Sequence, residues 1–189
     1  MCAPIMKNIP IALIYSRLII GFFIILLSIF HVNNYSVLAI TFLSIGLLTD
    51  IFDGIIARKL NISSEKLRRL DSSIDQLFFI SVAIATYIQC PVFFKFNIVK
   101  VAILMGAEVL IYSVSYLKFK KEIATHSIGA KVWTLILFAT LIEIILHCQS
   151  VVLFEFCLWI GLATRLEILA IVFTLKKWTN DVPTIYHAY

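Results

Sequence analysis

Long, uninterrupted runs of apolar residues restrict this chain to folds whose helices cross a membrane. The first run, Ile11–Phe30, covers about 20 residues, which is the length of helix that the hydrocarbon core of a bilayer requires. Hydrophobic residues make up 61% of the chain and its mean hydropathy is +1.01, values that a soluble domain does not normally reach. We therefore predict an all-α integral membrane protein in which residues 1–189 form a single domain.

Six transmembrane helices can be drawn from the apolar runs, with the helix breakers Pro10 and Pro91 expected at span ends. The second run is short and reaches a spanning length only if its helix continues through Asp50 to about Arg58. The predicted spans are Ile11–Phe30, Tyr35–Thr49, Ile74–Phe94, Ile98–Leu117, Val132–Cys148 and Val151–Leu175.

Basic residues are distributed unevenly over the segments between these spans. If the N-terminus is cytoplasmic, twelve basic residues fall on the cytoplasmic side and only Lys95 and Lys100 on the other, with Arg17 and Arg165 inside spans. Cytoplasmic loops collect Lys and Arg, so both termini are predicted inside. The net charge of +5 is then a matter of topology, and no basic run with exposed aromatics indicates nucleic acid. The twelve are Lys7, Arg58, Lys59, Lys66, Arg68, Arg69, Lys118, Lys120, Lys121, Lys131, Lys176 and Lys177.

Four aspartates lie at the end of the second span and the start of the third, at the predicted cytoplasmic face. Asp50 and Asp53 are three residues apart and Asp71 and Asp75 are four apart, so on helices each pair shares one face. Carboxylates at a membrane boundary are costly unless they are compensated. Divalent cations that prefer oxygen ligands, such as Mg²⁺, would compensate them and would bind phosphates. The sequence therefore predicts a polar cavity that holds metal and a phosphate-bearing ligand.

Three neighbours of the first aspartate pair suit the same ligand. Gly54 would let a ligand or a backbone approach closely, and Ala57 keeps the same face shallow one turn later. Arg58 supplies a planar cation suited to phosphate. A carboxylate left partly free of metal could take a proton from an attacking hydroxyl.

The pattern Asp50-x-x-Asp53-Gly54-x-x-Ala57-Arg58, followed by Asp71 and Asp75, resembles the signature of the CDP-alcohol phosphatidyltransferases. The resemblance implies six transmembrane helices and the transfer of a phosphatidyl group from a CDP-linked lipid, such as CDP-diacylglycerol, to a polar alcohol with release of CMP. It implies that two divalent cations, Mg²⁺ or Mn²⁺, are bound by Asp50, Asp53, Asp71 and Asp75. Asp75 would also be the catalytic base, and Gly54, Ala57 and Arg58 would line the CDP site. A homodimer, a role in phospholipid biosynthesis and a bacterial inner membrane are expected on the same ground.

Two further segments resemble the family, and one signature position departs from it. Asn8-Ile9-Pro10 with Leu13 and Arg17 looks like the family's entry to the first span, and Ser127–Thr134 looks like a later loop. The signature's second glycine is replaced by Leu67, which fills the space that a glycine would leave open.

Other interpretations stay open. The aspartates could belong to a solvated loop and pair with nearby basic residues, or to a non-enzymatic protein that binds divalent cations. A catalytically weakened relative of the family is a third alternative, because of Leu67. Inside or near spans, charged residues are functional candidates by default, and Arg165 could reach a carboxylate of another span. The others of this kind are Glu108, Glu143, Glu155 and Glu167.

Overall fold

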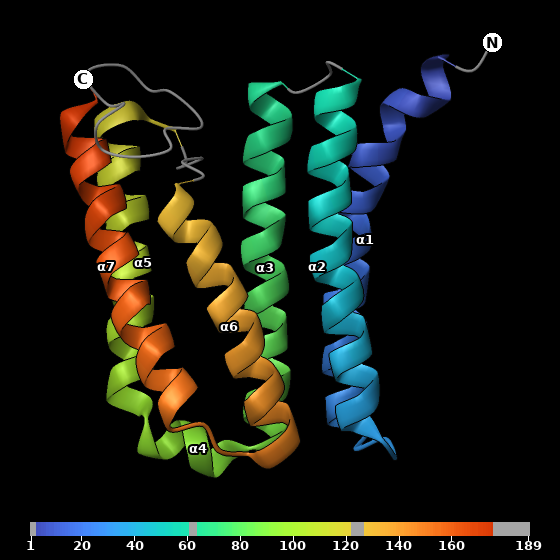
Figure 1. Ribbon diagram of the computed structural model, residues 1–189, viewed down its shortest axis with the longest axis vertical. Helices are drawn as coiled ribbons and strands as arrows, with labels where there is room; N and C mark the ends of the chain where they lie inside the picture. Colours follow the sequence, from blue (N-terminus) through green and yellow to red (C-terminus); the bar gives the residue numbers. More distant parts are fainter. Residues whose placement is uncertain (1–2, 61–63, 122–126, 176–189) are drawn as a thin grey trace. The chain divides into compact units, whose positions relative to one another are not determined.

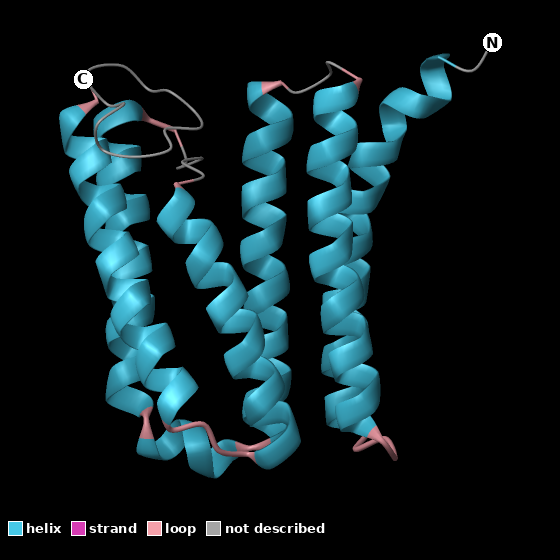
Figure 2. Cartoon of the chain, in the orientation of Figure 1, coloured by secondary structure: helices cyan, strands magenta, loops and turns pink. Residues whose placement is uncertain are grey.

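The computed structural model describes residues 3–60, 64–121 and 127–175, and every regular element in these ranges is an α-helix (Figures 1 and 2). The helices belong to two compact units, Met1–Pro91 and Val92–Tyr189. The all-α prediction is confirmed for these ranges, while the assignment of the chain to one domain stays a prediction. Lys176 and Lys177 lie outside the described residues.

Three long helices form the first unit: α1 (Ala3–Ile29), α2 (Tyr35–Lys59) and α3 (Glu65–Gln89). α1 packs along both of the others, whereas α2 and α3 contact each other only sparsely. The buried face of α1 can therefore contact α2 and α3 at the same time.

A buried stripe runs along α1. Its members recur at alternating intervals of four and three residues, which is the spacing of helices packed side by side. Small residues on the stripe bring backbones together, as is usual between membrane helices: a Cβ added to Gly21 would lie 3.1 Å from the Cβ of Ser81 on α3. The stripe consists of Pro10, Ile14, Arg17, Gly21, Ile24 and Ser28, so one long cationic side chain lies in an otherwise apolar or small seam.

Close contacts also join α3 to α1 and α2. The ring of Phe78 on α3 fills the space beside Gly46 on α2, where an added Cβ would lie 2.3 Å from the ring. Ser28 of α1 donates a hydrogen bond to the Ala85 carbonyl of α3 at 2.7 Å. Ser64 precedes α3 and caps it, because its hydroxyl accepts a hydrogen bond from the Leu67 amide at 3.2 Å.

The second unit contains the short helix α4 (Pro91–Phe96), which begins at the last residue of the first unit, and three long helices. The long helices are α5 (Ile98–Phe119), α6 (Ile128–His147) and α7 (Val152–Thr174), and α7 packs against both α5 and α6. Trp133 of α6 fills the space beside Gly161 of α7, where an added Cβ would lie 2.6 Å from the indole nitrogen.

An ionic contact ties the long helices of the second unit together. Arg165 on α7 bonds Glu108 on α5 through Nε at 2.9 Å and through Nη2 at 2.8 Å. Its guanidinium also stacks on the ring of Trp133, 3.6 Å from the ring centre. The prediction that Arg165 reaches a carboxylate of another span is therefore confirmed. Its Nη1 also lies 3.4 Å from the Gly161 carbonyl and 3.3 Å from the Thr164 hydroxyl, so these polar contacts all lie within the second unit.

Five of the helices are long and apolar enough to cross a membrane: Ile9–Ile29 of α1, together with α2, α5, α6 and α7. The chain is therefore an integral membrane protein. α3 has 25 residues but carries several charges in its first turns and is not among the five, so the count of six is not confirmed.

Pro10 lies inside α1, but the apolar span of this helix begins at Ile9, so the proline lies at the end of the span as predicted. Two other predicted boundaries were wrong. The third span was expected to reach Phe94, but α3 ends at Gln89 and Pro91 begins α4, because proline suits the first turn of a helix. The segment expected to be a loop before Val132 is largely the first turn of α6, which Ser127 caps through the Ala130 amide at 3.1 Å.

Candidate functional site

The four aspartates come together from two helices of the first unit. α2 continues through Asp50 and Asp53 to Lys59, as its predicted extension requires, and α3 carries Asp71 and Asp75 in its first turns. On α2 the buried positions Gly46, Asp53 and Ala57 continue the seam along which the helix packs. The intervals of three and four residues therefore place each aspartate pair on the side of its helix that faces the other pair.

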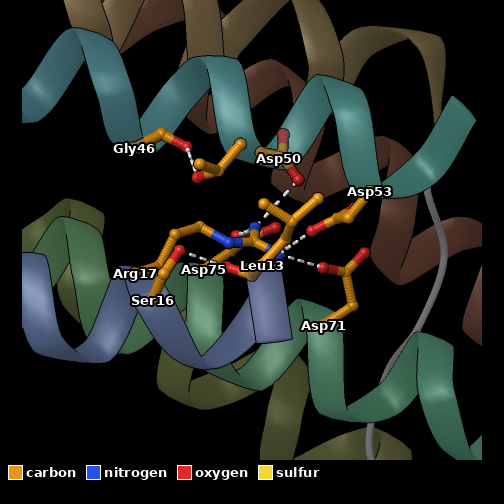
Figure 3. Close-up of polar contacts among 9 residues, drawn as sticks. Leu13, Ser16, Arg17, Gly46, Asp50, Asp53, Asp71 and Asp75 are labelled. Carbon is orange, nitrogen blue, oxygen red and sulfur yellow. Dashed lines mark hydrogen bonds and ion pairs between the residues drawn. The ribbon is translucent and has the colours of Figure 1, made fainter. Parts of the chain in front are cut away.

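Arg17 of α1 lies at the centre of the cluster and contacts all four carboxylates (Figure 3). Its Nη1 donates to Asp50 Oδ1 at 2.9 Å and forms an ion pair with Asp75. Its Nη2 donates to Asp71 Oδ1 at 2.5 Å and to Asp53. One guanidinium thus links α1 to both acidic helices.

The depth of burial differs among the charged groups. The Arg17 side chain has no exposed surface and that of Asp53 is 3% exposed, whereas the Asp50 side chain is 34% exposed. Asp71 and Asp75 are intermediate. The cluster is therefore closed at Arg17 and Asp53, and its open side is marked by Asp50, which is its most exposed member.

Three of the carboxylates fit a metal ion. Asp50, Asp53 and Asp71 each offer an oxygen, and these oxygens all lie within 4.8 Å of one another. Carboxylate oxygens are the ligands that Mg²⁺ and Mn²⁺ prefer. Asp75 is next to this group through its contact with Arg17, but it is not one of the three.

The space beside Gly54, as far as the structure describes the chain, is not filled by a neighbouring side chain in the way that the space beside a glycine between packed helices is. Among the described residues, a Cβ added there would meet one atom within 4 Å, Nη2 of Arg58 at 3.9 Å, whereas at Gly46 it would collide with a phenyl ring. Packing against the described part of the chain therefore does not require a glycine at position 54. Ala57 is buried and Arg58 is exposed, so the surface beside the aspartates is shallow and carries a cation.

Leu67, the departure from the signature, lies in the first turn of α3, one turn before Asp71. Its side chain is half-buried, and its amide is engaged by the cap at Ser64. It contributes no ligand atom, so the carboxylates converge in spite of the replacement.

Arg17 is the residue whose place in the site the sequence did not reveal. In the sequence it is part of the resemblance at the first span, without a role of its own. A charge in the middle of an apolar span is a signal that could have identified it. Its partner could not be identified, because four carboxylates were already assigned to metal.

A model of the CDP-alcohol phosphatidyltransferase family matches residues 7–175, a range that includes Arg17 and the four aspartates. No curated protein and no solved structure gives a significant match. Enzymes of this family transfer phosphate-linked groups from CDP-alcohols to alcohol acceptors in membranes and use divalent cations. Because the match covers most of the sequence and includes the residues that converge in the structure, this chain belongs to the CDP-alcohol phosphatidyltransferase family.

Proposed function

We propose that this protein transfers a phosphatidyl group, or a similar substituted phosphate, from a CDP-linked lipid such as CDP-diacylglycerol to a polar alcohol and releases CMP. The reaction would serve phospholipid biosynthesis. The observation that carries the proposal is the convergence of carboxylates from α2 and α3 at one site, three of them within reach of a single ion.

Asp50, Asp53 and Asp71 would hold two divalent cations, Mg²⁺ or Mn²⁺, with Asp75 contributing to the site. Metal bound there would offset the negative charge that develops on the diphosphate during transfer. The open side at Asp50 supports this assignment, because a ligand as large as a diphosphate needs access to the bound metal.

Asp75 would act as the base. Its carboxylate would take the proton of the acceptor hydroxyl while the hydroxyl oxygen bonds to the phosphorus that carries the lipid. The bond from that phosphorus to the CMP oxygen would break, and CMP would leave with the bonding electrons. The location of Asp75 beside the three-carboxylate group, rather than within it, supports this division of tasks.

Gly54, Ala57 and Arg58 would bind the CDP part of the donor. The open surface at Gly54 leaves room for the nucleotide, and the exposed Arg58 guanidinium suits a phosphate oxygen. The acyl tails would stay in the bilayer, so the donor would enter sideways from the membrane.

The distribution of basic residues supports an orientation in which the site and both termini face the cytoplasm, with a bacterial inner membrane as the expected location. By resemblance to the family we expect a homodimer.

The proposal is tested by measuring CMP release from CDP-diacylglycerol by the purified protein across a panel of alcohols, including glycerol 3-phosphate, serine and an inositol derivative. We expect release with at least one acceptor, dependent on Mg²⁺ or Mn²⁺ and absent after chelation. Metal binding without release for any acceptor would contradict the proposal. That result would favour a catalytically weakened relative, consistent with Leu67, or a non-enzymatic cation-binding protein.

A further inference from the structure

The two terminal nitrogens of the Arg17 guanidinium divide the four carboxylates equally between them. Each of its two terminal nitrogens contacts one carboxylate from α2 and one from α3: Nη1 contacts Asp50 and Asp75, and Nη2 contacts Asp53 and Asp71. The side chain therefore spans the two acidic helices at two points, which is what a bridging cation does.

The contacts of Arg17 use the oxygens that a metal would need. Nη1 bonds Asp50 Oδ1, and Nη2 bonds Asp71 Oδ1 and Asp53 Oδ2 (Figure 3). A metal ion would take lone pairs on the same carboxylates, at about 2.0–2.6 Å from their oxygens. An ion bridging Asp53 and Asp71 would therefore compete with the Nη2 group of Arg17 for these carboxylates.

The single positive charge of Arg17 is smaller than the negative charge that the four aspartates can carry. Four carboxylates can carry up to four negative charges, and one guanidinium supplies a single positive charge. Arg17 is also incompletely satisfied, since its Nε is buried and has no hydrogen-bond partner among the described residues. Arg17 thus links the two acidic helices, but one guanidinium cannot neutralise four ionised carboxylates, and a divalent ion would supply the missing charge.

We propose that Arg17 is the resident counter-cation of the metal-free site, and that a divalent ion must displace it from the carboxylates to bind. Arg17 then opposes metal binding and stabilises the protein in the absence of metal. The inference rests on the proposed function only in taking the aspartates as metal ligands. It adds a residue from α1 that sets their metal affinity.

The test compares the wild type with Arg17→Met in detergent, with Mn²⁺ affinity measured by electron paramagnetic resonance and thermal unfolding measured with and without Mg²⁺. We expect Arg17→Met to unfold at a lower temperature without metal, because the carboxylates lose their partner. We expect it to bind Mn²⁺ about tenfold more tightly or better, since displacing even one charge-assisted hydrogen bond costs about that factor. Mg²⁺ should raise its unfolding temperature more than that of the wild type.

Two further variants keep the test decisive. Arg165→Met removes a buried guanidinium of the second unit that pairs with Glu108 rather than with the aspartates, and it should lose stability while keeping the wild-type Mn²⁺ affinity. Arg17→Lys keeps one charge but cannot contact four carboxylates at once. It should bind Mn²⁺ with an affinity between those of the wild type and Arg17→Met, and it provides the answer if Arg17→Met does not fold.

The outcomes separate this inference from the proposed function. If the wild type binds Mn²⁺ and both Arg17 variants bind it equally or more weakly, Arg17 merely orients the ligands and the inference is overturned alone. If neither the wild type nor the Arg17 variants bind Mn²⁺, the aspartates are not metal ligands and both proposals fail. If the variants bind Mn²⁺ more tightly but CMP release never occurs, the inference holds and the proposed function does not.

Discussion

At the scale of single residues, the site is determined by how four carboxylates are compensated. One buried guanidinium contacts all of them. Individual aspartates differ in burial and in their place relative to the three-oxygen group, so their substitution should have different effects. The spacing in the sequence was enough to predict that each pair of aspartates shares one face of its helix, because residues three or four apart lie on the same side of a helix.

Asp75→Asn removes the proposed base but keeps the shape of the side chain and its ability to contact Arg17. We expect CMP release to fall by about 10²- to 10⁴-fold, which is the usual contribution of a general base. Thermal unfolding of the purified variant should stay close to that of the wild type. A variant that retains most of its CMP release would exclude Asp75 from the base role.

The two glycines of α2 offer a matched pair. Gly46→Ala places a Cβ 2.3 Å from the Phe78 ring, so we expect a loss of about 1–3 kcal/mol in stability from overpacking. Gly54→Ala meets only the flexible end of Arg58 at 3.9 Å, so stability should be unchanged or rise by up to about 1 kcal/mol because glycine is unfavourable inside a helix.

The measurements for this pair are thermal unfolding and the KM for CDP-diacylglycerol. The KM should rise in Gly54→Ala if the open surface receives the nucleotide. The reverse pattern, with Gly54→Ala less stable and its KM unaffected, would show that Gly54 serves packing.

At the scale of helices, the sequence predicts where the helices lie, but it does not predict which side of a helix packs against its neighbours. The apolar runs predicted the long helices, but some helix ends differ from the predicted ones. The differences occur where a residue favours a helix start, as Ser127 does at the cap of α6 and Pro91 at the first residue of α4. The packed face of α1 could not be predicted, because a membrane helix is apolar on all sides and burial follows small and polar residues instead. That is why Arg17 in the seam between Ile14 and Gly21 was recognised only in the structure.

The contact between Arg165 and Glu108 makes a prediction about α5 and α7. Arg165→Met removes the ion pair that Arg165 makes with the partly buried Glu108 carboxylate, so we expect a loss of about 3 kcal/mol in stability, the lower end of the range for broken buried pairs. Adding Glu108→Leu should restore much of the loss, because the partly buried carboxylate is then removed as well. Unfolding of the single and double variants in detergent measures both effects. A double variant as unstable as the sum of the single variants would contradict a direct pairing.

At the scale of the whole molecule, the number of membrane crossings is decided by α3. Five helices are apolar enough to cross, and α3 combines a charged first part that carries the site with an apolar remainder. Composition alone does not decide whether such a helix crosses, since two of its charges, Asp71 and Asp75, are compensated by Arg17 of α1. The family could be predicted from the sequence because the motif is specific, whereas the acceptor alcohol could not be predicted from any residue in it.

The crossings can be counted with fusions of a fluorescent protein that is active only in the cytoplasm. Six crossings place both ends of the chain on the same side, whereas five place them on opposite sides. We expect fluorescence from fusions at either end, and none from a truncation fused after Phe96, beyond α3. Fluorescence from only one end would show that α3 does not cross.

A crystal structure of the protein soaked with Mn²⁺, with an anomalous difference map, tests the central claim most directly. The account predicts an anomalous peak bounded by oxygens of Asp50, Asp53 and Asp71, with the Arg17 guanidinium withdrawn from those oxygens. A map without a peak between α2 and α3 at saturating Mn²⁺, with Arg17 still bonded to all four aspartates, would contradict it.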